Sequence, residues 1–360
     1  MDKCCMTLGQ ACSLKAGKFV SAKDIVENNS EELYPCYGGN GIRGYVREFS
    51  YEGEYPLIGR QGALCGNVNF ATGKFRATEH AVVVKPNIQM DVRWLYYKLL
   101  SMNLGQYATG AAQPGLAVAK LEGLPFTMPS LEEQKQLATI CDSIEKMLSL
   151  RKQQLAKLDE LVKSRFIELF GLPVSNSKGW NTEKMREVAP TINYSGGFED
   201  AVWLLNLDMV EAQTGRILDY LYVNKEEVGN STCTFDTTNV LYSKLRPYLN
   251  KVVIPNRCGY ATSELIPLKP NPMKLERVYL AFMLRSDEFV NMINEKVAGA
   301  KMPRVSMSDF REFDVPIPPM ELQNKFAAFV EQTDKSKLSI QQSIDQLETL
   351  KASLMQKYFG

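Results

Sequence analysis

Residues 124–171 read LPFTMPSLEEQKQLATICDSIEKMLSLRKQQLAKLDELVKSRFIELFG, and residues 313–360 read FDVPIPPMELQNKFAAFVEQTDKSKLSIQQSIDQLETLKASLMQKYFG. The two stretches align without a gap, and both end in Phe-Gly. The offset of 189 positions holds for identical residues along the whole alignment, among them Pro129 and Pro318, Glu132 and Glu321, Gln134 and Gln323, and Leu158 and Leu347. An ungapped register of this length indicates duplication of one unit, a globular segment followed by a long helix.

The duplication reaches upstream of these stretches. Residues 110–114 (GAAQP) lie at the same offset from residues 299–303 (GAKMP). At an offset of 184, Ala-Thr at 77–78 matches 261–262, and Lys-Pro at 85–86 matches 269–270. Two similar but unequal modules in one chain are expected of a protein that reads two things at once.

A first long helix is predicted from Leu131 to about Leu169, where the sequence contains neither Gly nor Pro. Ser130 and Glu133 have the spacing of a capping box at its start. The second copy predicts a helix over residues 320–358. Each helix would be roughly 55 to 58 Å long at 1.5 Å per residue, which exceeds the diameter of a small domain.

Apolar residues recur at spacings of three and four in both helices, which is typical of a coiled-coil seam. A helix of this length cannot bury its apolar stripe against its own module, so antiparallel packing of the two stripes is favoured. Ordinary long helices that fill one core are the alternative. The expected seam consists of Leu137, Ile144, Leu148, Leu155, Leu158 and Val162 in the first helix and Phe326, Val330, Ile340, Ile344, Leu347, Leu354 and Tyr358 in the second.

The segments before the helices predict α+β modules. Short β-like runs such as 55–59 and 80–84 alternate with Gly and Asn turns, and a helical stretch comes late in each module, at 92–102 and at 275–297. The Gly-rich segment 34–45 fits either a tight hairpin or a loop whose backbone approaches a ligand. The expected domains are a first recognition module (1–130), a first spacer helix (131–171), a second recognition module (172–319) and a second spacer helix (320–360).

Charge and cysteine content restrict the classes of protein to which this chain can belong. Lys and Arg number 42 against 41 Asp and Glu, a net charge of +1, so non-specific attraction to nucleic acid must come from local patches or from partner proteins. The 8 cysteines have no C-x-x-C spacing and His80 is the single histidine, so reduced thiols and no metal site are expected. No apolar run approaches the roughly 18 to 20 residues of a membrane span and no signal peptide is evident, so we expect a cytoplasmic location.

Motifs of catalysis are missing from the sequence. The Gly-x-Gly-x-x-Gly spacing at 39–44 is not followed by a helix pattern, and the sequence has no Walker motif, no Gly-x-Ser-x-Gly and no Asn/Asp-Pro-Pro-aromatic tetrapeptide of amino-methyltransferases. With one histidine, acid-base catalysis of the usual kind has few candidates. We therefore expect no chemistry and no cofactor on this chain.

Several motifs carry a resemblance to a known family. They are the proline-rich starts of the two helices at 124–129 and 315–319, the Glu-x-Gln that follows each, the YGGNGIRGY segment at 37–45 and the GAAQP turn at 110–114. Over its whole length the chain resembles the DNA-specificity subunit of type I restriction-modification systems. The resemblance implies a non-catalytic reader of double-stranded DNA, in which each module recognises one half of a split, asymmetric target and the helices set the gap.

The resemblance also implies partners. Two modification (methyltransferase) subunits would dock on the helices and supply S-adenosylmethionine for adenine methylation. Motor-nuclease restriction subunits would use ATP and Mg to cleave unmodified DNA.

Side chains that read base edges are Arg, Lys, Asn and Gln, while Tyr commonly contacts phosphates. Each candidate residue below is also compatible with an exposed charge or a turn. The candidate DNA-binding residues are Asn40, Arg43, Tyr45, Arg60, Gln61 and Gln113 in the first module and Lys244, Arg246, Tyr248, Lys251, Lys301 and Arg304 in the second.

Two further functions stay open. The chain is an enzyme if a catalytic motif has escaped notice, and then it would methylate or cut DNA alone. It is a scaffold if it dimerises through its coiled coil without reading DNA.

Overall fold

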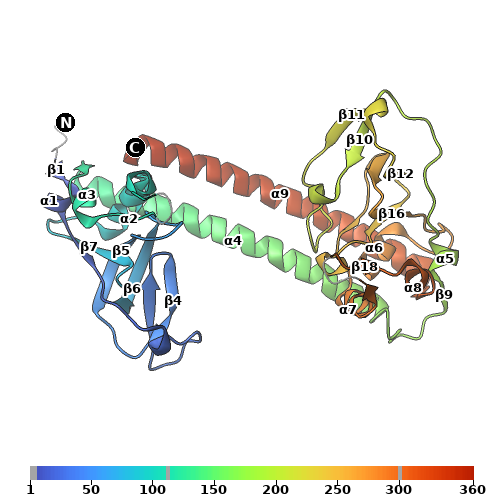
Figure 1. Ribbon diagram of the computed structural model, residues 1–360, viewed down its shortest axis with the longest axis horizontal. Coiled ribbons are helices and arrows are strands. Elements are labelled where there is room, and N and C mark those ends of the chain that lie inside the picture. The colour runs from blue at the N-terminus through green and yellow to red at the C-terminus, as the bar shows by residue number, and fades with distance from the viewer. Residues whose placement is uncertain (1–5, 111–113, 299–301) are drawn as a thin grey trace. The chain divides into compact units, whose positions relative to one another are not determined.

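The computed structural model describes residues 6–110, 114–298 and 302–360. The chain folds into two compact units, unit 1 (Met1–Lys152 and Gln341–Gly360) and unit 2 (Gln153–Ile340). The unit boundaries fall within the two long helices, α4 (Leu131–Phe170) and α9 (Met320–Phe359). Each unit therefore contains one α+β module and parts of both long helices (Figure 1). We call residues 6–130 module 1 and residues 172–319 module 2.

A six-stranded sheet of order β2-β7-β5-β6-β3-β4 forms the centre of module 1. Neighbouring strands are antiparallel except for the parallel pair β3 and β6. The strands are β2 (Cys12–Ala16), β3 (Tyr34–Gly38), β4 (Gly41–Val46), β5 (Tyr51–Gly59), β6 (Val68–Ala77) and β7 (Ala81–Pro86), and β1 (Met6–Thr7) pairs with β8 (Pro125–Phe126). The helices are α1 (Leu8–Ala11), α2 (Val92–Ser101), α3 (Val118–Glu122), η1 (Ala22–Asp24) and η2 (Leu104–Tyr107).

Both faces of this sheet are covered, which explains the uninterrupted apolar run of β7. Successive side chains of a strand point to opposite faces. Val82 and Val84 join the core that contains Trp94 of α2, whereas Ala81 and Val83 pack with Phe75 on the other face. The sequence of segment 34–46 fits either a tight hairpin or a ligand-binding loop, and the segment forms the β3–β4 hairpin.

Module 2 contains two main sheets, β11-β10-β15-β12 and β14-β13-β16. Their strands are β10 (Ala201–Leu205), β11 (Leu221–Asn224), β12 (Thr232–Phe235), β13 (Val240–Ser243), β14 (Val252–Val253), β15 (Gly259–Thr262) and β16 (Leu265–Leu268). The remaining strands pair as β9 (Thr182–Lys184) with β19 (Asp314–Pro316) and β17 (Val297–Ala298) with β18 (Arg304–Val305).

The helices of module 2 include two where the sequence predicted a single stretch over 275–297. Ser286 ends α6 (Arg277–Arg285), and its hydroxyl accepts a bond from the Phe289 amide at 3.3 Å, which caps α7 (Asp287–Asn294). A serine at this position starts a new helix instead of continuing the old one. The other helices are α5 (Met185–Val188), α8 (Met307–Arg311), η3 (Leu207–Met209), η4 (Lys225–Glu227) and η5 (Pro247–Leu249).

The strand pairing repeats between the modules at the offset of 184. Ile58 pairs with Val68 in module 1, and Tyr242 pairs with Val252 in module 2. The parallel pair also recurs, because β3 runs beside β6 as β10 runs beside β15. Strand β5 therefore corresponds to β12 and β13 together, and β6 to β14 and β15 together. The prediction of a duplicated α+β module followed each time by a long helix is confirmed.

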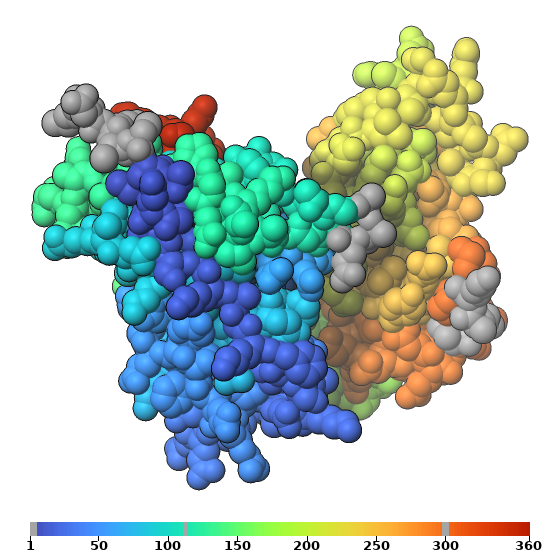
Figure 2. Space-filling model, turned by 60° about the vertical axis from the view of Figure 1, so that its left-hand side comes forward, coloured from blue at the N-terminus to red at the C-terminus, as the bar shows by residue number. Residues whose placement is uncertain are grey.

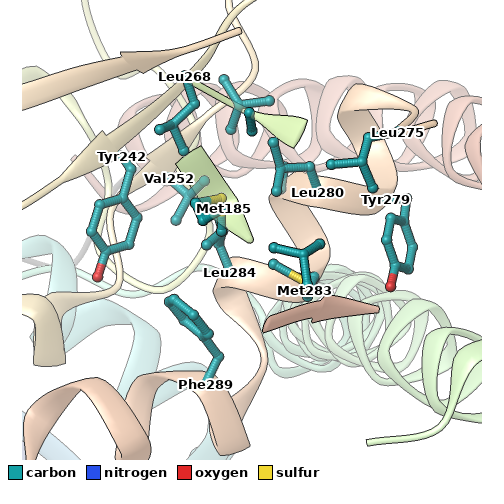
Figure 3. Packing of buried hydrophobic residues seen from close by; sticks show 14 of the residues in the cluster. Met185, Tyr242, Val252, Leu268, Leu275, Tyr279, Leu280, Met283, Leu284 and Phe289 are labelled. Atoms are coloured by element: carbon teal, nitrogen blue, oxygen red, sulfur yellow. The ribbon is translucent and has the colours of Figure 1, made fainter. Parts of the chain in front are cut away.

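The core of module 2 gathers around α6 (Figure 3). Leu280 and Leu284 of α6 are fully buried together with Val252 and Met185. Tyr279 of α6 extends this core to the long helices, because Phe166 and Phe170 of α4 pack on its ring at centroid distances of 5.8 and 4.7 Å.

The long helices pair in antiparallel fashion within each unit. In unit 1, Glu145 contacts Lys351 at 2.5 Å and Lys152 contacts Glu348 at 3.4 Å, so residue numbers rise along α4 while they fall along α9. In unit 2, Lys337 contacts Asp159 at 2.6 Å. Among the expected seam residues, those that are buried are Ile144, Leu148, Val162, Phe326, Val330 and Ile344, and those that are half-buried are Leu137, Leu155, Leu158, Ile340, Leu347 and Leu354.

Tyr358 is wrongly assigned to the seam by the heptad pattern. Its side chain is 45% exposed, whereas that of Phe359 is 1% exposed. Phe359 packs against Trp94 and Tyr97 of α2, each at a centroid distance of 6.2 Å. The reason is that module 1, and not a partner helix, covers this end of α9.

Within the described ranges, no helix combines the length and the apolar character that a membrane span requires.

Phe359→Ala is expected to lower the free energy of unfolding of unit 1 by about 3 to 5 kcal/mol, because the change leaves a cavity between α9 and α2. Tyr358→Ala is the matched control and should change this free energy by less than about 0.5 kcal/mol. Urea denaturation of both variants measures the difference. Equal losses in the two variants would contradict the packing described here.

Candidate DNA interface

Residues 60–67 of module 1 form a loop between β5 and β6, and several backbone hydrogen bonds hold its shape. The Gly59 amide donates to the Asn67 carbonyl at 2.8 Å and the Gly66 amide donates to the Gly59 carbonyl at 2.7 Å, which closes the loop. Gly62 and Gly66 adopt positive φ angles of 88° and 90°. Glycine is the residue that takes this conformation without a steric cost.

The same loop is held to a segment further along the chain. The Gly62 amide donates to the Pro114 carbonyl at 3.1 Å, and the Leu116 amide donates to the Arg60 carbonyl at 2.9 Å. The Arg60 amide in turn donates to the His80 carbonyl at 3.0 Å. These bonds place the loop next to residues 114–116, which begin at the proline of the GAAQP motif that the sequence repeat had singled out.

Residues 244–251 of module 2 form the equivalent loop with equivalent bonds. The Arg246 amide donates to the Pro303 carbonyl at 2.8 Å, and the Val305 amide donates to the Lys244 carbonyl at 2.9 Å. The closing bond also recurs, from the Ser243 amide to the Lys251 carbonyl at 3.0 Å. We call residues 60–67 and 244–251 the paired loops, since the closing bond and the bonds to the segments at 114–116 and 303–305 recur in both.

Arg246 takes the place of Gly62 in the paired loops, and it keeps the left-handed backbone with a φ of 49°. For a residue with a Cβ this conformation costs roughly 1 to 2 kcal/mol. The Arg246 side chain is exposed, and it makes no hydrogen bond or ion pair with the residues that the structure describes. A strained residue whose exposed cationic side chain has no bonding partner within the described residues is a candidate for contact with a ligand.

The other candidates of module 2 lie around the same loop. Lys244 is half-buried, and Tyr248 is 48% exposed at the position of Leu64 in module 1. Arg304 forms an ion pair with Glu264 at 2.9 Å, which lowers the pKa of the Glu264 carboxyl below its usual range. The Lys251 ammonium group donates a hydrogen bond to the Leu207 carbonyl at 2.7 Å, and burial lowers the pKa of Lys251.

In module 1 the loop meets the tip of the β3–β4 hairpin. The Asn67 side-chain amide donates to the Asn40 oxygen at 2.8 Å. Gly39 and Gly59 approach so closely that a Cβ on Gly59 would lie 2.0 Å from the Gly39 oxygen. The hairpin tip and the loop are therefore joined, and both belong to module 1, which Figure 2 shows mainly in blue and cyan.

The remaining candidates of module 1 have different environments. Gln61 is exposed, whereas Arg60 is half-buried and its Nε atom has no bonding partner among the described residues. Arg43 is exposed on β4, where it lies next to Gly38, and Tyr45 is half-buried two residues further along. Gln113 and Lys301 lie outside the described residues.

Sequence reasoning missed an exposed group of polar and aromatic side chains in module 2. The Arg257 guanidinium lies over the Tyr220 ring at 4.6 Å, and the Asn256 amide donates to the Tyr220 hydroxyl at 3.1 Å. Tyr222 of β11 is 51% exposed beside them. The Tyr-Leu-Tyr run at 220–222 was the available signal. In the parts of the chain that the structure describes, no three His, Cys, Asp or Glu side chains are arranged to hold a metal.

The two modules have a loop with the same backbone arrangement but with different exposed side chains. This is typical of a class of proteins that present two related but unequal recognition surfaces. Residues 3–160 and 210–349 match the family described as the type I restriction modification DNA specificity domain. The chain belongs to this family. The resemblance found in the sequence is thus confirmed, and the prediction of a non-catalytic specificity subunit is confirmed at the level of the family.

Two relatives in Escherichia coli match the chain over different lengths. The specificity subunit of the type I restriction enzyme EcoprrI is 52% identical over 140 residues, which are 39% of this chain and 35% of that subunit. The specificity subunit of EcoDI is 19% identical over 396 residues, which cover 98% of this chain and 86% of that subunit. The strong local match thus spans about a third of the first relative.

Two solved structures share the fold along nearly the whole chain. The crystal structure of a type I restriction-modification S subunit from M. genitalium has a TM-score of 0.65 at 17% identity, covering 100% of this chain and 96% of that one. A chain from a study of complex assembly and conformational transition of the type I R-M system has a TM-score of 0.59 at 14% identity, covering 99% and 97%.

Arg246→Gly is expected to leave the free energy of unfolding unchanged or to raise it by up to about 1 kcal/mol. Relief of the left-handed strain exceeds or balances the added freedom of the unfolded chain. The reciprocal change Gly62→Arg should cost about 1 kcal/mol. Thermal or urea unfolding measures both variants, and a clear loss of stability in Arg246→Gly would mean that this side chain supports the fold.

Proposed function

We propose that this chain is the specificity subunit of a type I restriction-modification complex and that it reads a split, asymmetric DNA target. Module 1 reads one half-site and module 2 the other. The observation that carries the proposal is the pair of loops. The two loops share one backbone arrangement and differ in the side chains that they expose. A common frame with different side chains is what two related readers of different base sequences require.

The chemistry of the paired loops suits base edges. Arginine forms two parallel bonds to guanine, and Gln or Asn does so to adenine. Module 1 offers Gln61 and Arg60 beside Asn40, and module 2 offers Arg246 beside Lys244. The two sets differ, as expected of an asymmetric target.

The net charge of +1 leaves a small non-specific phosphate contribution from this chain alone. We assign the remaining phosphate contacts to two modification subunits, which also bring S-adenosylmethionine and methylate adenine. Restriction subunits with ATP and Mg would cleave unmodified DNA. The complex would act in the cytoplasm, where the DNA lies.

Exposed apolar side chains on the long helices provide a surface for these subunits. Apolar side chains that gather on an exposed surface mark sites of contact with other proteins. In unit 1 they include Ile140, Met147, Leu150 and Leu350, between 44% and 49% exposed, and in unit 2 they include Leu161, Ile167 and Leu338, between 50% and 61% exposed.

A map of methylated adenines in the source genome, with and without this gene, tests the proposal. Loss of one split motif with a fixed gap is the expected result. An unchanged map, together with absence of binding of the assembled complex to any bipartite duplex, would contradict it and favour a scaffold that dimerises through the helices. Methylation by the isolated chain would instead identify an enzyme.

Arg246→Gly in the assembled complex is expected to weaken methylation of the native target by about 10- to 100-fold, because one good base contact contributes roughly 1 to 3 kcal/mol. Discrimination should relax at positions of one half-site and stay intact in the other. Arg216→Gln is the control, since it also removes an exposed charge of module 2, one that pairs with Glu211 at 2.9 Å. Relaxation of both half-sites, or equal losses in the control, would exclude base reading by Arg246.

A further inference from the structure

Two glutamines are buried at the first turns of the long helices, at matching positions of the sequence repeat. Gln134 of α4 is 1% exposed and Gln323 of α9 is 0% exposed. A buried amide side chain must have bonding partners, since an unpaired one costs about 1 to 3 kcal/mol. The partners of these two glutamines are therefore informative.

In unit 1, Gln134 joins the start of α4 to the start of α2. The Asp91 backbone amide donates to the Gln134 oxygen at 2.9 Å, and the Gln134 side-chain nitrogen donates to the Pro129 carbonyl at 2.9 Å. Asp91 is the N-cap of α2, because its carboxylate accepts from the Trp94 amide at 2.8 Å. One side chain thus ties the module's own helix to the long helix.

In unit 2, Gln323 makes the same connection between α9 and α6. The Glu276 backbone amide donates to the Gln323 oxygen at 2.8 Å, and the side-chain nitrogen donates to the carbonyls of Pro318 at 2.8 Å and Lys274 at 2.9 Å. Glu276 is the N-cap of α6, as Asp91 is of α2. The arrangement recurs although the N-cap residue differs.

Helices α2 and α6 also hold the far end of the other long helix. On α2, Lys98 and Ser101 donate to the Phe359 carbonyl at 2.5 and 2.9 Å. On α6, the Tyr279 ring receives Phe170 at 4.7 Å. Each module therefore binds the start of one long helix through directional hydrogen bonds. It binds the end of the other long helix mainly through burial of an aromatic ring.

We propose that Gln134 and Gln323 are positioning residues that fix the angle between each recognition module and its helices, and that through this angle they define the gap of the split target. This rests on the proposed function. A change of one base pair moves a half-site by about 3.4 Å along the DNA and turns it by about a tenth of a revolution. Apolar contacts alone permit sliding and rotation of this size, whereas paired hydrogen bonds to backbone atoms do not.

The test uses the full chain assembled with its modification subunits, and duplexes that carry the native half-sites with the native gap or with one base pair more or less. The wild-type complex should methylate the native gap and discriminate against the other two. In Gln134→Met and Gln323→Met this discrimination should fall about tenfold or more, while the base sequence of the half-sites is unchanged. Methionine keeps the shape of the side chain and removes its bonds.

Gln136→Met is the matched control, because Gln136 lies on the same helix, is exposed and bonds only to Glu132 among the described residues. It should keep the wild-type preference for one gap. Each single variant is compared with the wild type in thermal unfolding, so that a loss of fold is detected separately.

The outcomes separate this proposal from the proposed function. If the wild-type complex methylates no split target, the proposed function fails. If the wild type is selective for one gap and both variants retain that selectivity, or lose methylation equally at all three gaps, the glutamines have a structural role and the positioning proposal is overturned.

Discussion

Burial of a phenylalanine ring at the end of each long helix is the interaction on which each unit depends. A helix of 40 residues has far more apolar surface than one small module can cover, so it is attached to a module only near its ends. Phe170 enters the core around Tyr279, and Phe359 enters the core around Trp94. A buried aromatic side chain contributes a few kcal/mol through its lost contact with water. Gln134 and Gln323, at the opposite ends of the same helices, then add directional hydrogen bonds to a contact that burial alone does not orient.

Local signals in the sequence were sufficient for the duplication and the long helices. Neither helix contains Gly or Pro, the capping residues stand at the start, and the apolar period is sustained, so propensity and pattern agree. The fold class followed from the same agreement, and the family was recognised from the helix starts at 124–129 and 315–319. Apart from Tyr358, the expected seam residues are buried or half-buried, because their spacing determines the face of the helix on which they lie.

The paired loops could not be found in this way. Gly62 bonds to Pro114 and Arg246 to Pro303, partners more than fifty positions away, and no local pattern encodes such pairs. The residue types differ between the loops, so the sequence repeat is hidden there although the backbone repeats. Lys251 looked like a free cation in the sequence, but its bond to Leu207 depends on the tertiary fold. The heptad pattern assigned Tyr358, and not Phe359, to the seam. Phe359 is the buried residue because it packs against module 1, a contact that a pattern within the helix does not contain.

The two left-handed positions of the loop in module 1 have different freedom to vary during evolution. A Cβ on Gly62 would have no atom within 4 Å, whereas a Cβ on Gly66 would lie 2.2 Å from the Gly105 nitrogen. The first position can thus acquire a side chain at the modest cost of its backbone conformation, as Arg246 has done in module 2, while the second is closed to substitution in module 1. The exposed side chains of this loop can therefore change at a few outward positions without any rebuilding of the backbone that displays them.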